Sequence, residues 1–365
     1  MKKQIFFLLI LCIFISGCSN GRNPAEEDAS TESSGVFQWP TEKWSISSPE
    51  AQQIDSNLLN KADARIEENY PNIYSLLVVR HGFLVYEKYY RGMNEDSDNQ
   101  VYSVTKSVMS ALTGIALREK IITGTDQKVS ELLPGYFSAI DNPKKKDITV
   151  KNVLTMSGGL ETIDSDYAGY FTSGDWLDYA IKKPLTDEPG SKFTYNTGLT
   201  HFLSGIITEK SGMNTKEFAD KYLFGPLNIK VKKWDIDRKG YYGGGSGLYL
   251  TPRDMAKFGF LYLNNGKWED KQLIPQEWAA ESTQKHIQPS DEVDYGYLFW
   301  IAPMTDKTRS KSYPTYRADG AGGQKIVVIP ELDMLVVITA NENSSSKDGA
   351  DTQALIPDYI LPAVN

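Results

Sequence analysis

The stretch that decides the fold reads Tyr102-Ser103-Val104-Thr105-Lys106-Ser107-Val108-Met109-Ser110-Ala111-Leu112-Thr113-Gly114-Ile115-Ala116-Leu117. Its apolar residues recur at helical spacing, which predicts a buried helix from about Ser103 onward. Ser103 and Lys106 then share one face of the first turn, where the amine can hydrogen-bond the hydroxyl. A serine hydroxyl needs a base beside it, and a lysine whose proton affinity falls on burial can serve as that base. The stretch therefore makes Ser103 a candidate nucleophile and Lys106 its candidate activator.

The Ser-x-x-Lys spacing is not specific by itself, because residues 282–285 and 344–347 have it too. Neither copy heads an apolar helix, and the second lies in a run of Ser, Lys, Asp and Gly that is typical of a solvated loop. On spacing alone, the alternative is that Ser103 is an N-cap and Lys106 a surface residue with a buried stem.

The chain has 365 residues, of which 40% are hydrophobic, and carries a net charge of −8. This length allows a large core, in one large domain or two smaller ones. The acidic balance argues against nucleic acid as a partner, since the only cationic run is Lys144-Lys145-Lys146.

The first 18 residues have the features of a targeting segment, with Lys2-Lys3 before an apolar run that is too short for an ordinary membrane span. Ile15-Ser16-Gly17-Cys18 then resembles the lipobox of bacterial lipoproteins, in which cleavage leaves a lipid on the cysteine. We expect residues 1–18 to be this signal, residues 19–45 a disordered tether, and the protein to be anchored by Cys18 outside the cytoplasm at a bacterial cell membrane. The alternative is an ordinary secretory signal that is cut nearby. Cys12 would be removed, which excludes disulfides and cysteine metal sites.

Residues 46–365 are predicted to fold, with strands at both ends. Strand patterns cover residues 74–80, 83–90, 324–329 and 334–340, the first two joined by a His81-Gly82 turn. Helical patterns cover residues 55–69, 150–156, 176–182, 200–210 and 350–361, and another helix starts at Thr251. The order predicts an α/β (α+β) fold: a sheet lobe of about residues 50–100 and 245–365, with an inserted helical lobe of about residues 107–240.

Other segments can complete a site around Ser103. Tyr195 follows a turn and precedes a helix, so its phenol can project into a cleft, where a cationic lysine would lower its pKa. Residues 320–324, Gly-Ala-Gly-Gly-Gln, enter a strand with a backbone that a substrate can approach. Residues 243–247, Gly-Gly-Gly-Ser-Gly, predict a flexible loop. The rival scheme is a Ser-His-Asp site, and the three histidines, none of them in a motif, are His81, His201 and His286.

Collinear motifs extend from about residue 73 to residue 338. They are Ser103-Val104-Thr105-Lys106-Ser107, Leu154-Thr155-Met156-Ser157-Gly158-Gly159-Leu160, Pro189-Gly190-Ser191-Lys192-Phe193-Thr194-Tyr195, residues 244–248, Thr251-Pro252-Arg253-Asp254-Met255-Ala256-Lys257-Phe258-Gly259 and residues 320–324. Together they resemble the serine beta-lactamase and penicillin-recognising superfamily, in its class C-related branch. Within that branch the chain is most similar to the carboxylesterase and 6-aminohexanoate-dimer hydrolase group.

The resemblance implies a beta-lactamase/transpeptidase-like fold, in which an antiparallel sheet flanked by helices faces an all-helical lobe across the active-site cleft. It implies Ser103 as the acylated nucleophile, Lys106 as its activator and Tyr195 as general base. The mechanism that it implies needs no metal and no cofactor. The resemblance also implies which backbone groups form the oxyanion hole and contact the substrate: those of Ser103, Gly322, Gly323 and Gln324.

Two departures from the family pattern concern the substrate. Tyr195-Asn196-Thr197 lacks the family's asparagine two residues after the tyrosine, which leaves Asn196 as a candidate pocket residue. Ala321-Gly322-Gly323 stands where many relatives carry Lys-Thr-Gly or His-x-Gly, so Ala321 replaces a cation that would bind the carboxylate of a β-lactam or of a peptide terminus. Both departures keep the acylation chemistry and argue against penicillin-type substrates.

We therefore expect a lipid-anchored serine hydrolase that cleaves an ester or small amide through a Ser103 acyl-enzyme. One alternative is a beta-lactamase or D,D-peptidase that acts on cell-wall-type substrates by the same mechanism. The other is a non-catalytic sensor or binding protein related to the penicillin-binding proteins. The joint presence of Ser103, Lys106 and Tyr195 argues against that last alternative.

Overall fold

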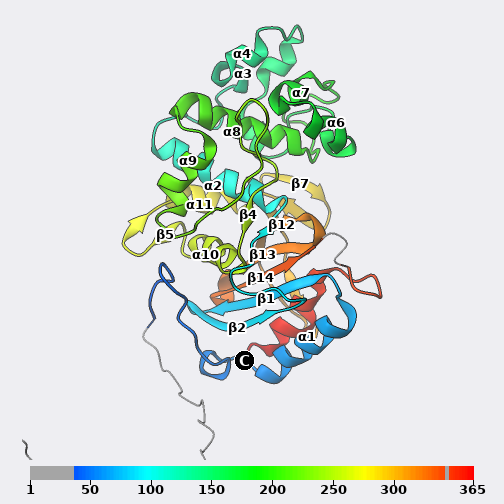
Figure 1. Ribbon diagram of the computed structural model, residues 1–365. Coiled ribbons are helices and arrows are strands. Elements are labelled where there is room, and N and C mark those ends of the chain that lie inside the picture. Colours follow the sequence, from blue (N-terminus) through cyan, green and yellow to red (C-terminus); the bar gives the residue numbers. More distant parts are fainter. Residues whose placement is uncertain (1–36, 342–344) are drawn as a thin grey trace, which may run out of the picture. The chain divides into compact units, whose positions relative to one another are not determined.

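The structure is a computed structural model that describes residues 37–341 and 345–365 (Figure 1). The expected signal segment and the lipobox with Cys18 lie outside the described residues. Among the residues that are described, no helix is both long enough and apolar enough to cross a membrane.

An eight-stranded sheet, antiparallel at every pair, has the order β2-β1-β14-β13-β12-β9-β8-β7 (Figure 1). Its strands are β1 Ile73–Arg80, β2 Phe83–Tyr89, β7 Ile287–Ser290, β8 Val293–Tyr295, β9 Trp300–Ile301, β12 Tyr316–Gly320, β13 Gln324–Ile329 and β14 Met334–Ala340. β1 pairs with β14, from Ile73 beside Ala340 to Arg80 beside Met334. The expected sheet built from both chain ends is confirmed.

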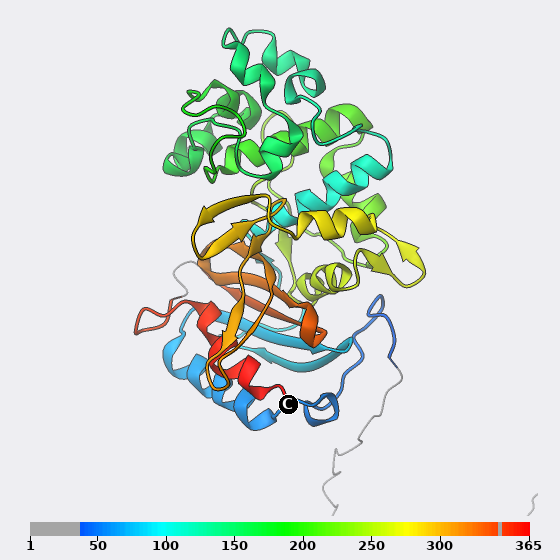
Figure 2. The ribbon, with the colours of Figure 1, turned by 180° about the vertical axis from the view of Figure 1, so that it is seen from behind.

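Both faces of this sheet are covered at its central strands, which are apolar on both sides. Along β1, Leu77 and Val79 enter one core and Leu76 and Val78 the other, as strand alternation requires. The first core lies against α2 (Val104–Arg118) and α10 (Pro252–Leu263), and the second against α1 (Ser56–Asn69) and the C-terminal helices. Figure 2 shows α1 and the C-terminal segment side by side on that second face.

Residues 104–240, all of them described, form helices joined by loops and isolated β-bridges. After α2 they are α3 Val129–Leu132, α4 Pro134–Phe137, α5 Val150–Leu154, α6 Tyr167–Thr172, α7 Trp176–Lys182, α8 Thr197–Ser211 and α9 Thr215–Ala219. The chain enters and leaves this helical lobe at one place, because β3 (Asn99–Gln100) pairs with β4 (Tyr249–Leu250). The remaining elements are β5 Lys267–Trp268, β6 Lys271–Gln272, α11 Gln276–Ser282, β10 Met304–Asp306, β11 Lys311–Tyr313 and α12 Leu361–Ala363.

Three expectations need correction. The six strands from β7 to β12 were not predicted, because each has at most five residues and no clear alternation. The tether does not reach residue 45, since Trp44 is buried and the ring of Trp39 packs against Phe260. The expected closing helix is broken into Thr352–Ala354, Ile356–Ile360 and Leu361–Ala363, consistent with Pro357 and Pro362 in its path.

Candidate active site

Helix α2 starts directly after Ser103, as its sequence predicts. Tyr102 has a φ of 46°, a left-handed conformation of the strained kind that clusters at functional sites. Ser103 occupies the N-cap position, but its side chain makes no capping hydrogen bond. The hydroxyl of Ser103 is therefore available to other groups, and the N-cap alternative for this side chain is wrong.

Lys106 lies on the same face of α2 and is 1% exposed, so it is no surface residue. Its Nζ lies 2.8 Å from Ser103 Oγ, 3.0 Å from Thr197 Oγ1 and 2.7 Å from the carbonyl oxygen of Gly245. Burial lowers the pKa of Lys106 to about 7, against a smaller opposing effect of Asp164. Near neutral pH the amine is thus partly unprotonated and able to accept a proton from Ser103.

The loop at residues 243–247 is packed rather than flexible, which corrects the expectation. A Cβ on Gly245 would lie 2.4 Å from the carbonyl oxygen of Thr197, and one on Gly244 would lie 2.7 Å from that of Thr200. Only glycine allows this close approach to the start of α8. The approach brings the Gly245 carbonyl to Lys106.

Tyr195 lies beside the pair, with its ring centroid 4.8 Å from Lys106 Nζ and its ring stacked on Trp300. Burial raises the pKa of Tyr195 well above its ordinary value, although a hydrogen bond with Ser103 partly opposes this. The expected lowering of this pKa is wrong, because the phenol is desolvated and the charge of Asp164 adds to the rise. At pH 7 Tyr195 is a neutral phenol.

The segment at residues 320–324 reaches the same place. Gly320 lies so close to the segment that precedes α2 that a Cβ there would be 2.3 Å from the carbonyl oxygen of Val101. Gly322 and Gly323 have φ values of 77° and 94°, which turn the chain back into β13. The Gln324 side chain is fully buried and bonds the backbone N–H and carbonyl of Ala340, so this side chain is not available to a ligand.

A cavity of about 380 Å³ opens beside Ser103. Its lining residues are Gln100, Tyr102, Ser103, Tyr167, Phe171, Thr197, Ser246 and Ala321, none of them cationic. Tyr167 and Phe171, on α6, are partly exposed and their rings stack, so they give the cavity an aromatic rim. Across residues 37–341 and 345–365, no group of three or more His, Cys, Asp or Glu side chains is placed to hold a metal ion.

The two cations on neighbouring strands are paired elsewhere. Arg317 Nε lies 2.8 Å from Asp319, and Lys325 Nζ lies 3.5 Å from Asp319 and 3.7 Å from Asp351. Along β12 the side chains of Arg317 and Asp319 alternate with Ala318, which joins the core on the α2 side. Neither cation therefore replaces the charge that Ala321 lacks.

Asn196 is not a pocket residue, which corrects the expectation. Its side chain is 2% exposed, accepts the Leu199 N–H as the N-cap of α8, and donates to the carbonyls of Leu160 and Glu161. The next residue, Thr197, faces the cavity and contacts Lys106 instead.

Sequence reasoning missed Asp164, whose carboxylate binds polar groups of Thr197 and Tyr167 beside Lys106. Its carboxylate accepts a hydrogen bond from the Thr197 hydroxyl at 2.7 Å, another from the Thr197 N–H at 2.7 Å, and one from the Tyr167 hydroxyl. Burial raises the pKa of Asp164, but the Lys106 ammonium and these hydrogen bonds outweigh burial and hold it below its usual value. No motif marks Asp164, which is one of 47 acidic residues.

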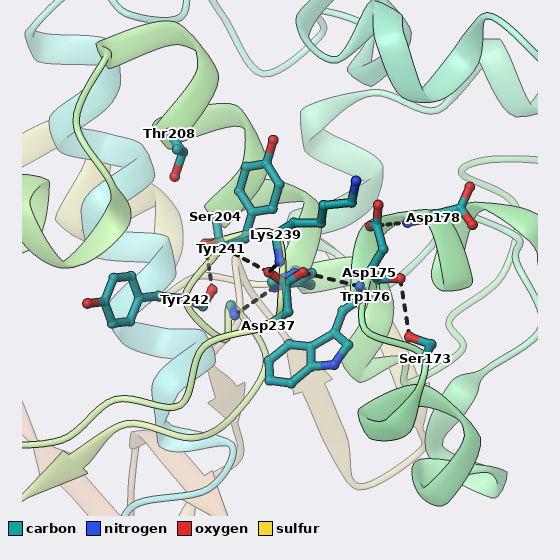
Figure 3. Close-up of polar contacts among 12 residues, drawn as sticks. Ser173, Asp175, Trp176, Asp178, Ser204, Thr208, Asp237, Lys239, Tyr241 and Tyr242 are labelled. Atoms are coloured by element: carbon teal, nitrogen blue, oxygen red, sulfur yellow. Dashed lines mark hydrogen bonds and ion pairs between the residues drawn. The ribbon is translucent and has the colours of Figure 1, made fainter.

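The histidines are engaged elsewhere, so the Ser-His-Asp scheme has no support. His81 contacts Gln52, and His286 stacks on Tyr297. His201 is buried in the helical lobe, accepts the Gly244 N–H and lies 3.7 Å from Asp237. Figure 3 shows the Asp237 carboxylate accepting the backbone N–H groups of Trp176, Lys239 and Tyr241, a set of bonds that ties the lobe together.

Comparison with known proteins supports the family resemblance that the sequence motifs indicate. The family described as Beta-lactamase matches residues 65–359. The chain is 24% identical over 382 residues to an Escherichia coli protein provisionally named D-alanyl-D-alanine carboxypeptidase. That alignment covers 82% of this chain and 86% of the relative. It is 26% identical over 236 residues to the 6-aminohexanoate-dimer hydrolase of Paenarthrobacter ureafaciens, over 60% of this chain and 58% of that one.

Among solved structures, EstCE1, described as a hydrolase with promiscuous acyltransferase activity, has a TM-score of 0.69 at 17% identity. The alignment covers 86% of this chain and 99% of EstCE1. At this identity the likeness shows the fold, which is the expected beta-lactamase/transpeptidase-like one.

Proposed function

The chain belongs to the beta-lactamase family, and on this premise we propose that it is a serine hydrolase that cleaves an uncharged ester or small amide through an acyl-enzyme on Ser103. The observation that carries the proposal is the contact of a buried lysine, whose pKa is lowered to about 7, with a serine hydroxyl at the mouth of a cavity. Members of this family are hydrolases, and the relatives include a 6-aminohexanoate-dimer hydrolase and a protein provisionally named D-alanyl-D-alanine carboxypeptidase.

In the proposed acylation step, Ser103 Oγ attacks the substrate carbonyl carbon while its proton passes to Lys106 Nζ. The carbonyl π electrons move to the oxygen, and the backbone N–H groups of Ser103 and Gln324 are proposed to stabilise that oxyanion. Collapse of the tetrahedral intermediate expels the alcohol or amine, which takes up a proton. Tyr195 is neutral and hydrogen-bonded with Ser103, so we assign it as the group that passes this proton rather than as a phenolate base. Water then attacks the acyl-enzyme by the reverse route.

The cavity supports an uncharged acyl group. Its walls are aromatic, small, hydroxylic or, at Gln100, an uncharged amide, and Ala321 occupies the place at which relatives grip a carboxylate. Tyr167 and Phe171 offer stacked rings at the rim to a planar or apolar group.

The second candidate is a cell-wall D,D-peptidase, favoured by the name of the Escherichia coli relative that matches 82% of the chain. It needs a group that binds the carboxylate of a peptide terminus, and the cavity lining provides no cation.

A substrate screen separates the candidates. We expect kcat/KM for short-chain p-nitrophenyl esters to exceed that for a chromogenic cephalosporin and for D-alanyl peptides. Preference for either of the last two would overturn the ester assignment and leave the Ser103 mechanism standing. A folded protein that turns over none of them and is not acylated would support the non-catalytic alternative.

A further inference from the structure

We propose that Asp164 is a positioning residue of the Ser103 site, which acts through the Thr197 hydroxyl to keep the lone pair of the Lys106 amine directed at Ser103. The proposal rests on the proposed function and deepens it, since it concerns the activation of the same nucleophile.

The first step is the state of the Asp164 carboxylate. One oxygen accepts hydrogen bonds from the hydroxyls of Tyr167 and Thr197, and the other from the Thr197 N–H and the Thr162 hydroxyl. An ionised carboxylate offers about four acceptor positions and no donor. All four are used, so this surrounding fits only the ionised form.

The second step concerns Thr197. Its hydroxyl proton points at Asp164, 2.7 Å away, because the carboxylate can only accept. Toward Lys106 Nζ, 3.0 Å away, the hydroxyl therefore presents a lone pair and acts as an acceptor.

The third step concerns the neutral amine, which has two N–H groups and one lone pair. The carbonyl of Gly245 accepts one N–H and Thr197 accepts the other. Only the third contact, Ser103 Oγ at 2.8 Å, can donate. The lone pair is thus left for the serine proton. Without Asp164 the Thr197 hydroxyl could turn and donate to that lone pair instead.

The same carboxylate also favours the ammonium that forms when Lys106 takes the proton. Burial lowers the pKa of Lys106, and Asp164 opposes this as the charged group that faces it. The other titratable groups around the pair are the phenols of Tyr167, Tyr170 and Tyr195, which burial keeps neutral.

The first test follows the charge. In the full-length protein, the rate of covalent labelling by a fluorophosphonate is measured against pH for wild type, Asp164→Asn and the control Asp166→Asn. Asp166 is half-exposed and its carboxylate caps α6, a role that asparagine keeps. We expect the midpoint of the acid limb to fall by about one pH unit in Asp164→Asn only. An unchanged midpoint in folded Asp164→Asn overturns the proposal, since a merely structural role would change rate or stability but not this midpoint.

The second test follows the hydroxyl and stays decisive if Asp164→Asn does not fold. Thr197→Ser keeps the hydroxyl and, as the conservative variant, should label faster than Thr197→Val. Thr197→Val keeps the shape but removes the acceptor of the Lys106 N–H, and should label about tenfold more slowly at high pH, the effect of one lost hydrogen bond. Equal rates for the two variants overturn the proposal.

A third measurement needs no reactive serine. The ¹³Cε resonance of Lys106, assigned by its loss in Lys106→Arg, is titrated in protein that carries labelled lysine. Its midpoint should fall in Asp164→Asn and stay in Asp166→Asn. If wild type is not labelled by the fluorophosphonate, the proposed function fails, and this titration still decides whether Asp164 sets the charge of Lys106.

Discussion

At Ser103 the group that receives the proton is an amine, so reactivity depends on how far its surroundings lower the proton affinity of Lys106. Burial is the main cause, and three contacts hold the amine in place. Burial raises the pKa of Tyr195 instead and keeps its phenol protonated. The two groups are therefore matched as acceptor and donor of one proton.

The pH profile should show this division. Protonated Lys106 cannot accept the serine proton, so kcat/KM for an ester should rise with pH through about 7, the pKa of Lys106. Tyr195→Phe should lower kcat by roughly 10²–10⁴ and leave that midpoint in place. A midpoint near 10.5, the ordinary value for lysine, would contradict the account.

A second residue, Ala321, should govern selectivity. Ala321→Lys adds a cation at the cavity, and one charge-assisted hydrogen bond contributes about 1.5–3 kcal/mol, or roughly 10- to 150-fold in rate. We expect kcat/KM for a chromogenic cephalosporin to rise in this range, with Ala321→Met as the uncharged control of similar length. An equal rise in both variants would show that length, not charge, is what the site lacked.

Of the contacts between individual site residues, the sequence could predict only those between neighbours on one helix. Ser103 and Lys106 are three residues apart on one helix, so their contact follows from helix geometry. Asp164 meets them only through folding, and its segment carries no motif. The Tyr195 pKa was predicted in the wrong direction, since charge can be read from sequence but the depth of burial cannot.

Among the elements, α2 matters most because it carries both reactive groups and is buried along most of its length. The C-terminal half of α2 packs against α11. There the ring of Trp278 lies over Gly114, and its N–H donates to the carbonyl of Ser110. This contact fixes the helix against the sheet side of the molecule.

Gly114→Ala should therefore destabilise the fold. The new Cβ would lie 2.3 Å from the Trp278 ring, so overpacking should lower the free energy of unfolding by about 1–3 kcal/mol. This exceeds the gain of about 1 kcal/mol in helix propensity. Gly124→Ala, whose Cβ meets nothing within 4 Å, is the control and should stay within about 0.5 kcal/mol of wild type in urea unfolding. A stabilised Gly114→Ala would contradict this packing.

The long and strongly patterned elements were predictable. β13 and β14 agree with their predicted bounds, and the His81-Gly82 turn has the two positive φ values that a tight hairpin requires. The short strands from β7 to β12 were not, because strands of two to five residues owe their conformation to pairing in the sheet rather than to their own pattern.

For the whole molecule, the arrangement of sheet and helical lobe follows from where the chain leaves and re-enters the sheet. β3 and β4 close the helical lobe at its base, and Ser103 follows β3 after only Val101 and Tyr102. This topology could be inferred from strands at both chain ends, whereas the meeting of residues 164, 195 and 320–324 at Ser103 needed the family resemblance or the structure.

Attachment to the membrane remains a prediction from the lipobox. Cells grown with a labelled fatty acid should yield labelled wild-type protein and unlabelled Cys18→Ser, because Cys18 is the only cysteine that the expected cleavage would leave. Equal labelling of the two proteins would reject the lipid anchor.

The central claim is that Ser103 is the nucleophile, and covalent labelling tests it most directly. A fluorophosphonate is allowed to react with folded protein at about pH 8, and the modified residue is mapped by peptide mass spectrometry, with Ser107→Ala as a control on the same helix. We predict one phosphonylated residue, Ser103, in both proteins and no label in Ser103→Ala. A label on another serine, or folded wild-type protein that takes up none, would contradict the account.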